Sequence, residues 1–474
     1  MKQQQTQQRK DDFFNDLTEF SKKILAEKEV LVIGHHDCDG ITATAIAVDF
    51  LRWGNVKADF MSIKQLDNHA MQKISHLTNS TLLFVDLGSG QLPALEEAGF
   101  TNFYVIDHHP PERPDDPRQI NPHPYGFDGG FEVSGAGMVY LVARQAGRRE
   151  MAHAAVVGAV GDMQDSGGKL HSLNRLILDD AIEQGTIAVK HDLRLFGRQS
   201  RSLPQMLAYS NDPFLPHLTG NPSACEAFLK EIGVNTRQNG TTKSYVDLTH
   251  QEKEHLTTQL YINLLDAGTP EFLIQRMVGE VYTLLKEPLH SELRDAQEYS
   301  TVLNACGRHE NAETGVAVVL GDRQSKWAEA KNMLNYHREM LKQGIDFVTQ
   351  NGAETHPHLY FFNGTGKISE NIIGIVAGMA YGARVIKTDK PVLALAEDKD
   401  DLNSYKISAR ATWDLVHRGI HLGDAMRNCS RQLGGEGGGH DIAAGARVPK
   451  EQLQKFIELV DDTFKQQREN KNQA

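Results

Sequence analysis

The chain of 474 residues is 40% hydrophobic and carries a formal net charge of −12 at pH 7. Its length exceeds what one ordinary hydrophobic core accommodates, so two or three compact domains are expected. The net acidity excludes a globally basic surface, so binding to nucleic acid would have to rest on a local basic cleft or on metal ions.

Cysteine usage and hydropathy argue against secreted disulfide scaffolds and membrane proteins. The four cysteines are scattered and form no CxxC pair, which disfavours a disulfide framework or a zinc ribbon. The first ten residues, MKQQQTQQRK, lack the apolar core of a signal peptide, and no run reaches the ~20 apolar residues that a membrane span needs. We therefore expect a soluble cytoplasmic protein.

The N-terminal third alternates between strand-like apolar runs and helical patterns. A short amphipathic helix is expected from Asp12, and the alternation continues to about Asp162. This pattern is typical of a doubly wound α/β domain with a parallel sheet, here over residues 12–166. The first ten residues and the tail after about Lys465 are rich in Gln, Asn and Lys and are expected to be frayed.

Three short apolar runs in this domain each end in side chains that can bind metal. The runs are residues 30–33, 82–85 and 103–106. The side chains that follow them are His35, Asp37, Asp39, Asp86, Asp107, His108 and His109. Because the carboxyl ends of parallel strands lie at one edge of a sheet, these side chains are expected to converge. A small apolar helix or turn over residues 153–162 ends in Asp162 and is a fourth candidate arm.

A cluster of several carboxylates needs compensating positive charge. Two carboxylates about 4 Å apart repel by roughly 4 kcal/mol at an effective dielectric near 20. Carboxylate oxygens with one or two imidazoles suit Mn²⁺ or Mg²⁺ better than Zn²⁺ or Ca²⁺. Two such ions ~3.5–4 Å apart favour in-line displacement at phosphorus, so the pattern predicts two ions per active site and phosphodiester hydrolysis.

Each of these features has a plain structural alternative. An aspartate that follows a strand is often a helix N-cap, and an Asp-His-His tripeptide also arises by chance in unrelated chains. Their joint occurrence, in order and each at a strand end, favours the site.

Beyond the first domain the pattern changes twice. Residues 167–287 show longer helical periods broken by Pro, Gly and Asn loops, which predict a linker helix and an inserted helical module without a catalytic cluster. Residues 288–350 are expected to form connecting helices, with one strand over residues 316–320. Residues 351–465 return to mixed strands and helices and predict a smaller C-terminal α/β domain, with a cleft between the two α/β domains.

The C-terminal domain contains a second candidate site. Residues 437–439 are three glycines that precede His440, and consecutive glycines let backbone amides approach a bound phosphate. Upstream, Lys406, Ser408 and Arg410 alternate along the chain, so on a strand they would project from one face. Arg410 could grip a phosphate with two hydrogen bonds. A plain glycine-rich turn is the structural alternative.

These motifs resemble those of the DHH phosphoesterase superfamily. The motif HxDxDG at residues 35–40, the strand end at Asp86, DHH at residues 107–109 and the Asp162 element are similar to its four motifs. GGGHxxAAG at residues 437–445 is similar to its DHH-associated C-terminal domain. This pairing resembles RecJ-type exonucleases, nanoRNases and cyclic-dinucleotide phosphodiesterases rather than family II pyrophosphatases.

Two longer stretches narrow the resemblance. Residues 120–141 and 293–308 are similar in particular to archaeal RecJ-like nucleases, including one that associates with GINS in the replisome. The resemblance covers most of the chain and is weaker between about residues 190 and 270. It implies single-stranded nucleic acid as a partner, and GINS or another replisome protein as a partner of the insert. Cys38 stands where related sequences often have alanine, which leaves the expected ligands unchanged.

The resemblance also implies roles for individual residues. Asp86 would bridge two Mn²⁺ or Mg²⁺ ions, and the six expected ligands are His35, Asp37, Asp39, Asp86, His108 and Asp162. Asp107 would orient His108, and His109 would contact the scissile phosphate or assist the leaving group. The residues expected to hold the substrate are Ser408, Arg410, Gly438, Gly439 and His440. No role is assigned to His36 or His123.

The leading hypothesis is a single-strand-specific exonuclease in DNA replication or repair that releases nucleoside 5′-monophosphates from DNA, with RNA open as a second substrate. One alternative keeps the chemistry and changes the substrate to short oligonucleotides, 3′,5′-bisphosphorylated nucleotides or cyclic dinucleotides. Another alternative is a catalytically inactive replisome scaffold, against which the complete ligand set argues. The direction of cleavage is left open.

Overall fold

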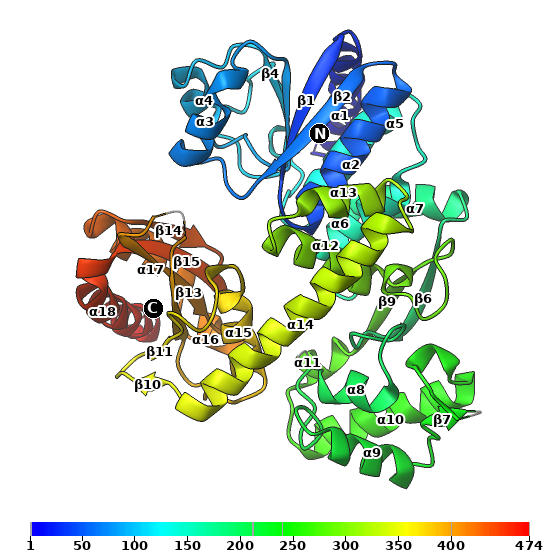
Figure 1. Cartoon of the computed structure of the whole chain (residues 1–474), viewed down its shortest axis with the longest axis vertical. Coiled ribbons are helices and arrows are strands. Elements are labelled where there is room, and N and C mark those ends of the chain that lie inside the picture. The colour runs from blue at the N-terminus through cyan, green and yellow to red at the C-terminus, as the bar shows by residue number, and fades with distance from the viewer. Residues whose placement is uncertain (1, 211–212, 239, 400, 474) are drawn as a thin grey trace. The chain divides into compact units, whose positions relative to one another are not determined.

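The computed structural model describes all residues except 1, 211–212, 239, 400 and 474 (Figure 1). The chain divides into two compact units, Met1–Leu334 and Asn335–Ala474. The long helix α14 (Ser325–Asn351) contains the boundary between them. Among the described helices, none combines the length and the apolar character that crossing a bilayer requires.

The first unit contains a parallel five-stranded sheet in the order β2-β1-β3-β4-β5. Its strands are β1 (Glu29–His35), β2 (Lys57–Ile63), β3 (Leu82–Val85), β4 (Phe103–Ile106) and β5 (Gln119–Ile120). Alternate residues of β3 enter two separate cores, Leu83 and Val85 on one face and Leu82 and Phe84 on the other. Burial on both faces explains why these strands are continuous apolar runs. The prediction of a parallel α/β domain is confirmed.

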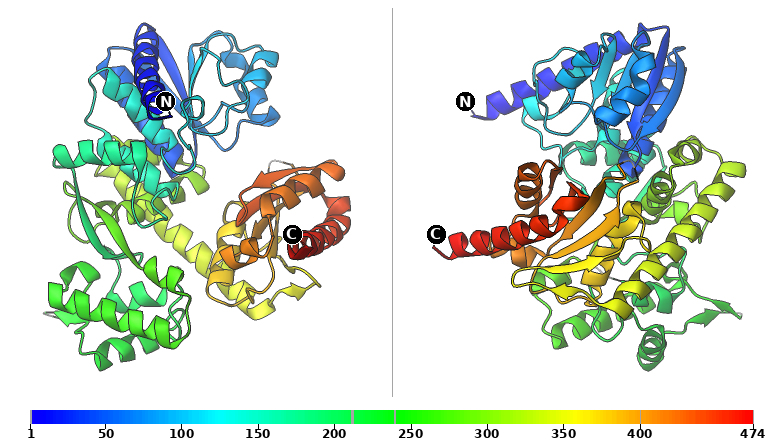
Figure 2. Two further views of the ribbon diagram at one scale, coloured as in Figure 1. Left: turned by 180° about the vertical axis from the view of Figure 1, so that it is seen from behind. Right: turned by 60° about the vertical axis from the view of Figure 1, so that its left-hand side comes forward.

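Helices cover both faces of this sheet (Figures 1 and 2). The helices on one face are α1 (Lys2–Leu25), α2 (Cys38–Trp53), α5 (Gly135–Gln145) and α6 (Ala152–Gly161). Those on the other are α3 (Asn68–Ile74) and α4 (Leu92–Glu97). Helix α1 begins at Lys2 rather than at the predicted Asp12, so the first residues are helical and not frayed. Glutamine favours helix, and Gln7 and Gln8 each donate a 2.8 Å hydrogen bond to an aspartate one turn later.

The inserted module is mostly helical, as predicted, and has its own hydrophobic core. Helix α7 (Ser172–Glu183) leads into β6 (Ile187–Leu193), which pairs in antiparallel fashion with β9 (Val278–Leu284). Between these two strands lie α8 (Leu203–Ala208), α9 (Pro222–Glu231), β7 (Arg237–Gln238), β8 (Thr241–Thr242), α10 (His250–Asp266) and α11 (Glu271–Gln275). Figure 1 shows β6 and β9 as the two links between this module and the rest of the first unit.

Two connecting helices follow the insert, α12 (Ala296–Arg308) and α13 (Ala312–Val319). The strand predicted over residues 316–320 is wrong, because these residues continue α13. Asn311 caps this helix by accepting a hydrogen bond from Thr314 N, and Val316 and Val318 are buried in the main core. A short, fully buried apolar run has no distinguishing period, so the pattern alone did not separate helix from strand.

The second unit is a six-stranded sheet in the order β10-β11-β12-β13-β15-β14. Its strands are β10 (Glu354–Thr355), β11 (Tyr360–Asn363), β12 (Val392–Glu397), β13 (Ser404–Arg410), β14 (Glu436–Gly439) and β15 (Ala443–Pro449). Only the β11–β12 pair is parallel among the described ladders of this sheet. The helices are α15 (Glu370–Gly382), α16 (Trp413–His417), α17 (Leu422–Gln432) and α18 (Leu453–Gln473). The C-terminal α/β prediction is confirmed, whereas the tail expected to fray after Lys465 is part of α18.

Candidate metal centre

The carboxyl ends of β1 and β3 bring His35 and Asp86 together. His35 Nδ1 lies 3.1 Å from Asp37 Oδ1 and 3.6 Å from Asp86 Oδ2. The other ring nitrogen, Nε2, lies 3.1 Å from the carbonyl oxygen of Lys64. A histidine that donates from Nε2 to a carbonyl keeps its Nδ1 lone pair for a cation. This arrangement therefore aims one imidazole nitrogen and two carboxylates at one point.

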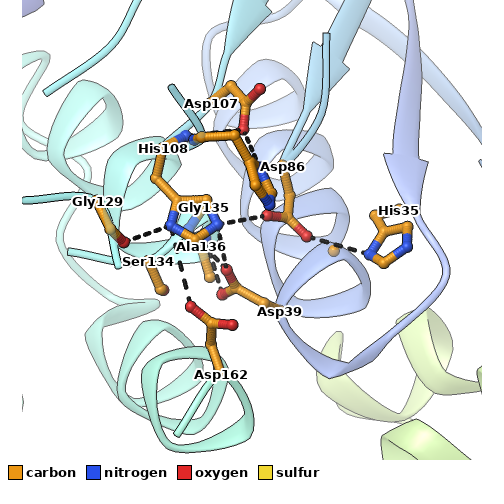
Figure 3. Close-up of polar contacts among 12 residues, drawn as sticks. His35, Asp39, Asp86, Asp107, His108, Gly129, Ser134, Gly135, Ala136 and Asp162 are labelled. Carbon is orange, nitrogen blue, oxygen red and sulfur yellow. Dashed lines mark hydrogen bonds and ion pairs between the residues drawn. The ribbon is translucent and has the colours of Figure 1, made fainter. Parts of the chain in front are cut away.

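Asp86 occupies the centre of the cluster (Figure 3). Its Oδ2 faces His35, and its Oδ1 lies 3.1 Å from His108 Nε2. The residue is 2% exposed, and in the described part of the chain Oδ1 accepts no hydrogen bond of good geometry. Its backbone is left-handed, with φ +61°, which costs of order 1–3 kcal/mol for a residue other than glycine. A Cβ at Gly135 would lie 2.5 Å from Oδ1, so glycine is needed there.

A second group of donors forms around His108. Its Nδ1 lies 2.6 Å from the carbonyl oxygen of Gly129, which leaves Nε2 directed at Asp86 and at Asp39 Oδ2, 3.9 Å away. Asp39 is fixed by the N–H groups of Gly135 and Ala136, at 2.6 and 3.1 Å, at the start of α5. Backbone N–H groups at a helix N-terminus stabilise a carboxylate. Asp162, at the end of α6, brings Oδ2 to 3.9 Å from His108 Nδ1.

Asp107 positions His109 rather than His108. Its Oδ1 lies 2.8 Å from His109 Nδ1 and accepts hydrogen bonds from the backbone N–H groups of His108 and His109. Burial acts to raise the pKa of Asp107, but the hydrogen bond and charge of His109, the charge of His108 and the Ser89 N–H together outweigh it and lower the pKa to about 2. The expectation that Asp107 orients the His108 ring is wrong, because Gly129 holds that ring. The His109 side chain is 56% exposed and so can meet a substrate.

Charge in this cluster is poorly compensated. Burial raises the pKa of Asp39 well above its usual range, and the Asp86 and Asp162 carboxylates raise it further. Burial also raises the pKa of Asp162, to about 6. For His35 and His108, burial lowers the pKa, but the neighbouring carboxylates outweigh it and leave both values raised. These shifts all have the direction expected of a site that added positive charge would stabilise.

The donor set fits a pair of hard cations. Three overlapping groups each bring their ligand atoms within 4.8 Å of one another: His35, Asp37 and Asp86; Asp39, His108 and Asp162; and Asp86, Asp107, His108 and His109. Carboxylates with imidazoles and no thiolate suit Mn²⁺ or Mg²⁺. The predicted ligands therefore converge, with Asp86 placed between the two histidines.

Two supporting elements were not recognised in the sequence. Buried Gln164 donates from Nε2 to Asp162 Oδ2 and to the Gly129 carbonyl, both at 2.8 Å, and so links two arms of the site. Helix α12 holds the turn after β1: Asn304 accepts a 3.0 Å hydrogen bond from Cys38 N. Arg308, at the end of α12, has its pKa lowered by burial, and Asp37 acts against this effect. Only Gln164's position two residues after an expected ligand could have drawn attention to it.

In the second unit, three of the expected substrate residues, Ser408, Arg410 and Gly438, share one face of the sheet. The register aligns Ser408 of β13 with Gly445 of β15, and Gly445 with Gly438 of β14. Gly438 and Gly445 are half-buried and have no side chain. On this row of Ser408, Gly445 and Gly438, no side chain of β14 or β15 therefore covers the sheet face beside Ser408. Arg410 lies two residues along on the same face, against Gly374 of α15, where a Cβ would lie 2.5 Å from Nη2.

The turn that follows β14 requires a particular backbone conformation. Gly439 has φ +130°, a conformation that side chains rarely permit. The next residue, His440, is exposed, and its N–H donates a 2.9 Å hydrogen bond to Ala443 O. Arg427 of α17 was not predicted, yet its guanidinium lies 3.9 Å from where a Gly438 Cβ would be. The second unit thus presents two arginines and a histidine around exposed glycine backbone.

Three family models match the chain in succession. They are the DHH family N-terminal domain over residues 29–160, the DHH-CID domain over residues 195–278 and the DHHA1 domain over residues 359–466. The chain belongs to the DHH superfamily. The first match covers the strands that carry the candidate ligands, and the third covers the glycine-rich row.

Known proteins support the same family. A curated relative, an uncharacterised protein of Methanocaldococcus jannaschii, is 29% identical over 454 residues, 92% of this chain and 94% of that protein. RecJ of Thermus thermophilus in complex with Mn²⁺ is 17% identical at a TM-score of 0.56, with 95% of this chain and 55% of that chain covered. This DHH-superfamily chain thus spans little more than half of that RecJ.

A second structural likeness is to CDC45 of Entamoeba histolytica, which is 12% identical at a TM-score of 0.59, with 96% of this chain and 98% of that chain covered. At these identities the likenesses show the fold alone. Together with the family models, they identify a DHH-superfamily member with a RecJ-like fold. The DHH match and the clustered ligand atoms support a metal-dependent phosphoesterase.

Proposed function

We propose that this protein is a metal-dependent exonuclease, specific for single strands, that hydrolyses DNA to nucleoside 5′-monophosphates, with RNA left open as a second substrate. The observation that carries the proposal is the position of Asp86, whose two oxygens face His35 and His108 from the middle of two ligand groups. This is the arrangement that a bridged pair of cations requires.

The residues divide between two cation positions. His35, Asp37 and Asp86 would hold one cation, and Asp39, Asp86, His108 and Asp162 the other. When bound, two Mn²⁺ or Mg²⁺ ions would neutralise the phosphodiester and lower the pKa of an attacking water. Backbone N–H groups already fix Asp37 and Asp39, and the Gln164 side chain fixes Asp162, so these carboxylates need little reorganisation at the moment of reaction.

His109 is the residue placed to touch the substrate beside the ions. Its Nδ1 is engaged by Asp107, so the ring is held in one orientation with Nε2 turned away from that carboxylate. Nε2 can then donate to a phosphate oxygen or to the leaving oxygen. In the second unit, we assign phosphate and nucleotide contacts to Ser408, Arg410, Gly438, Gly439 and His440.

The proposal is tested with end-labelled oligonucleotides. Purified protein with Mn²⁺ should degrade a single strand to mononucleotides and leave a blunt duplex intact, and labels on either end report the direction of cleavage. A preference for dinucleotides over long single strands would instead favour the alternative of short oligonucleotides, bisphosphorylated nucleotides or cyclic dinucleotides.

The role of the second unit is tested by Arg410→Ala. This change should raise the KM for the oligonucleotide by about tenfold, because charge-assisted bonds to phosphate are worth about 1.5–3 kcal/mol. It should leave Mn²⁺ binding unchanged, since Arg410 is not among the ligand groups. Arg418→Ala is a matched control, because Arg418 is an exposed arginine of the same unit that pairs with exposed Asp414 one turn away. An unchanged KM for Arg410→Ala would contradict the assignment.

The likeness to CDC45 favours a second candidate, a replisome scaffold without catalysis. We further propose that GINS or another replisome protein binds the insert, where α10 and α11 expose Tyr261, Leu265 and Phe272. Binding of purified GINS by protein that degrades no oligonucleotide in Mn²⁺ would establish the scaffold. Binding together with degradation would support a nuclease that acts in the replisome.

A further inference from the structure

Beside the candidate metal centre, the first unit exposes an aromatic pair that its own folding does not explain. The rings of Phe131 and His171 stack with centroids 5.1 Å apart and planes 26° apart. Phe131 is 37% exposed, although burying a phenylalanine would stabilise the fold. His171 is half-buried, so the two rings present one partly exposed aromatic surface. We call Phe131 and His171 the stacking pair.

The stacking pair lies close to the metal ligands. Phe131 is two residues after Gly129, so their Cα atoms are at most about 7.6 Å apart. The Gly129 carbonyl oxygen holds the His108 ring at 2.6 Å. Buried Gln164 donates to this same oxygen and to Asp162. One buried side chain therefore joins the Phe131 loop to two ligand arms.

The pair is also held rigidly before any ligand binds. The carbonyl oxygen of Glu132, next to Phe131, accepts a 2.9 Å hydrogen bond from Asn174 N in the first turn of α7. Asn174 Nδ2 donates in turn to Gln164 Oε1 at 2.6 Å. His171 is the N-cap residue of α7. The two rings thus stand on segments fixed by one hydrogen-bond network, which lowers the entropic cost of binding.

Gly167 keeps the stacking pair uncovered. A Cβ on Gly167 would lie 3.6 Å from the Phe131 ring and 3.9 Å from His171 Nε2. The φ angle of Gly167 is not in the left-handed region, so its backbone does not require glycine. The missing side chain instead leaves the rings open. Nearby, Met163 directly follows Asp162 and is 63% exposed with a left-handed φ of +59°, a strained conformation of the kind that collects at functional sites.

We infer that Phe131 and His171 form a stacking platform for a nucleobase of the substrate, next to the phosphate that is cut. The inference rests on the proposed function and adds a base contact that the metal centre itself cannot provide. Every nucleobase has a π-face, so a platform of this kind binds single strands with little sequence preference. A paired base is already stacked within its duplex, so the platform also favours single strands.

The first test measures binding without turnover. Single-stranded oligonucleotides with 2-aminopurine at successive positions are titrated with the full chain in EDTA. Quenching is expected at one or two adjacent positions and should be lost in Phe131→Ala and in Gly167→Leu, which covers the rings. Phe131→Trp should restore it. Trp53→Ala, an exposed aromatic at the far end of α2, should leave it intact.

The second test measures turnover in Mn²⁺. Phe131→Ala and Gly167→Leu should raise KM about fivefold or more with little change in kcat, as expected for the loss of one base stack. The increase should vanish on an oligonucleotide whose stacked nucleotide is abasic. Equal quenching in all variants, or an equal rise in KM on the abasic strand, would overturn the platform. Variant-sensitive quenching by a protein that cleaves nothing would refute the exonuclease and leave the platform standing.

Discussion

Two buried acidic clusters of the first unit, which come within three residues of each other at Asp162 and Asp165, are compensated in different ways. In the metal centre, the ion pairs of Asp39, Asp86 and Asp162 within the described chain are all with histidines. The second cluster, which we call the insert junction, joins β6 and the following loop to α12. Its members are Asp165, Asp192, Arg194, Arg198, Asp295 and Glu298.

The insert junction contains its own permanent cations. Arg194 lies 2.5 Å from Asp165, and Arg198 lies 2.7 Å from Asp192 and 3.5 Å from Asp295. Arginine stays charged at any physiological pH, so Asp165, Asp192 and Asp295 each have a permanent cation beside them. The difference teaches that buried carboxylates alone do not mark a metal site. The side chains that pair with the carboxylates distinguish the two kinds of cluster. Arginine partners indicate a structural cluster, whereas histidine partners with shifted pKa values indicate a cation site.

The largest expected effect is on turnover, which should depend on the metal centre and not on the insert junction. Asp86→Asn should reduce turnover about a thousandfold or more, because the bridging oxygen supplies several kcal/mol of transition-state stabilisation. The free energy of unfolding without metal should stay the same or rise, because one of three repelling carboxylates becomes neutral. Single-turnover assays and urea unfolding measure the two quantities. Asp179→Asn, at an exposed acid of α7, is the control, and retained turnover in Asp86→Asn would remove the bridging role.

The opposite result is expected at the insert junction. Arg198→Met should destabilise the protein by about 3–5 kcal/mol, because it leaves buried Asp295 and half-buried Asp192 without their cation. The affinity for Mn²⁺ should be unchanged. Arg149→Met is the control, since Arg149 pairs with Asp180 and Glu183 while 40% exposed, and such pairs are worth about 1 kcal/mol or less. If both variants lose equally little unfolding free energy, the arginines do not stabilise the insert junction.

The metal centre was predictable because its signals are local. A strand buried on both faces is a continuous apolar run, and an acid that follows it lies at the ligand edge of a parallel sheet. His35, Asp86 and His108 each follow such a run, so their convergence was predicted from the sequence. The six expected ligands meet as predicted, and their role in binding metal stays a prediction.

The supporting contacts were not predictable, because they depend on how distant segments pack. Nothing near Gln164 in the sequence indicates that it bonds Gly129, and nothing near Asp107 shows that Gly129 rather than Asp107 holds the His108 ring. The insert junction was missed for the same reason, since Glu298 bonds backbone about a hundred residues away. The prediction for α13 was wrong for a different reason, because its run of buried valines shows no periodicity that distinguishes a helix from a strand.

A smaller effect distinguishes the clusters by their response to cations. Mn²⁺ should raise the midpoint of thermal unfolding of the wild type, by the equivalent of about 2.7 kcal/mol at a hundred times the dissociation constant. Arg198→Met should keep this shift and Asp86→Asn should lose most of it. Differential scanning fluorimetry with Mn²⁺, Mg²⁺ and EDTA measures it. If Asp86→Asn showed the same rise in its unfolding midpoint as the wild type, the ions would bind elsewhere.

The smallest effect concerns protons at the insert junction. Burial and the neighbouring Asp295 raise the pKa of Glu298 to about 7, against hydrogen bonds from Ser200 and Gln199 that lower it. The folded protein therefore keeps a proton that the unfolded chain has released, so stability falls as pH rises from the ordinary glutamate value to about 7. The loss between about pH 6 and 7 amounts to roughly 1 kcal/mol.

Glu298→Gln removes this titration while it keeps a side-chain oxygen for one of the backbone N–H groups. Its unfolding free energy, measured in urea with saturating Mn²⁺, should fall less steeply over the same pH interval than that of the wild type. Glu313→Gln, at an exposed acid of α13, should leave the slope unchanged. Saturating Mn²⁺ keeps the metal centre from titrating, so a slope that is the same in all three proteins would mean that Glu298 is ionised at neutral pH. The N–H groups of Gln199 and Ser200 would then be enough to hold Glu298 as a carboxylate inside the junction.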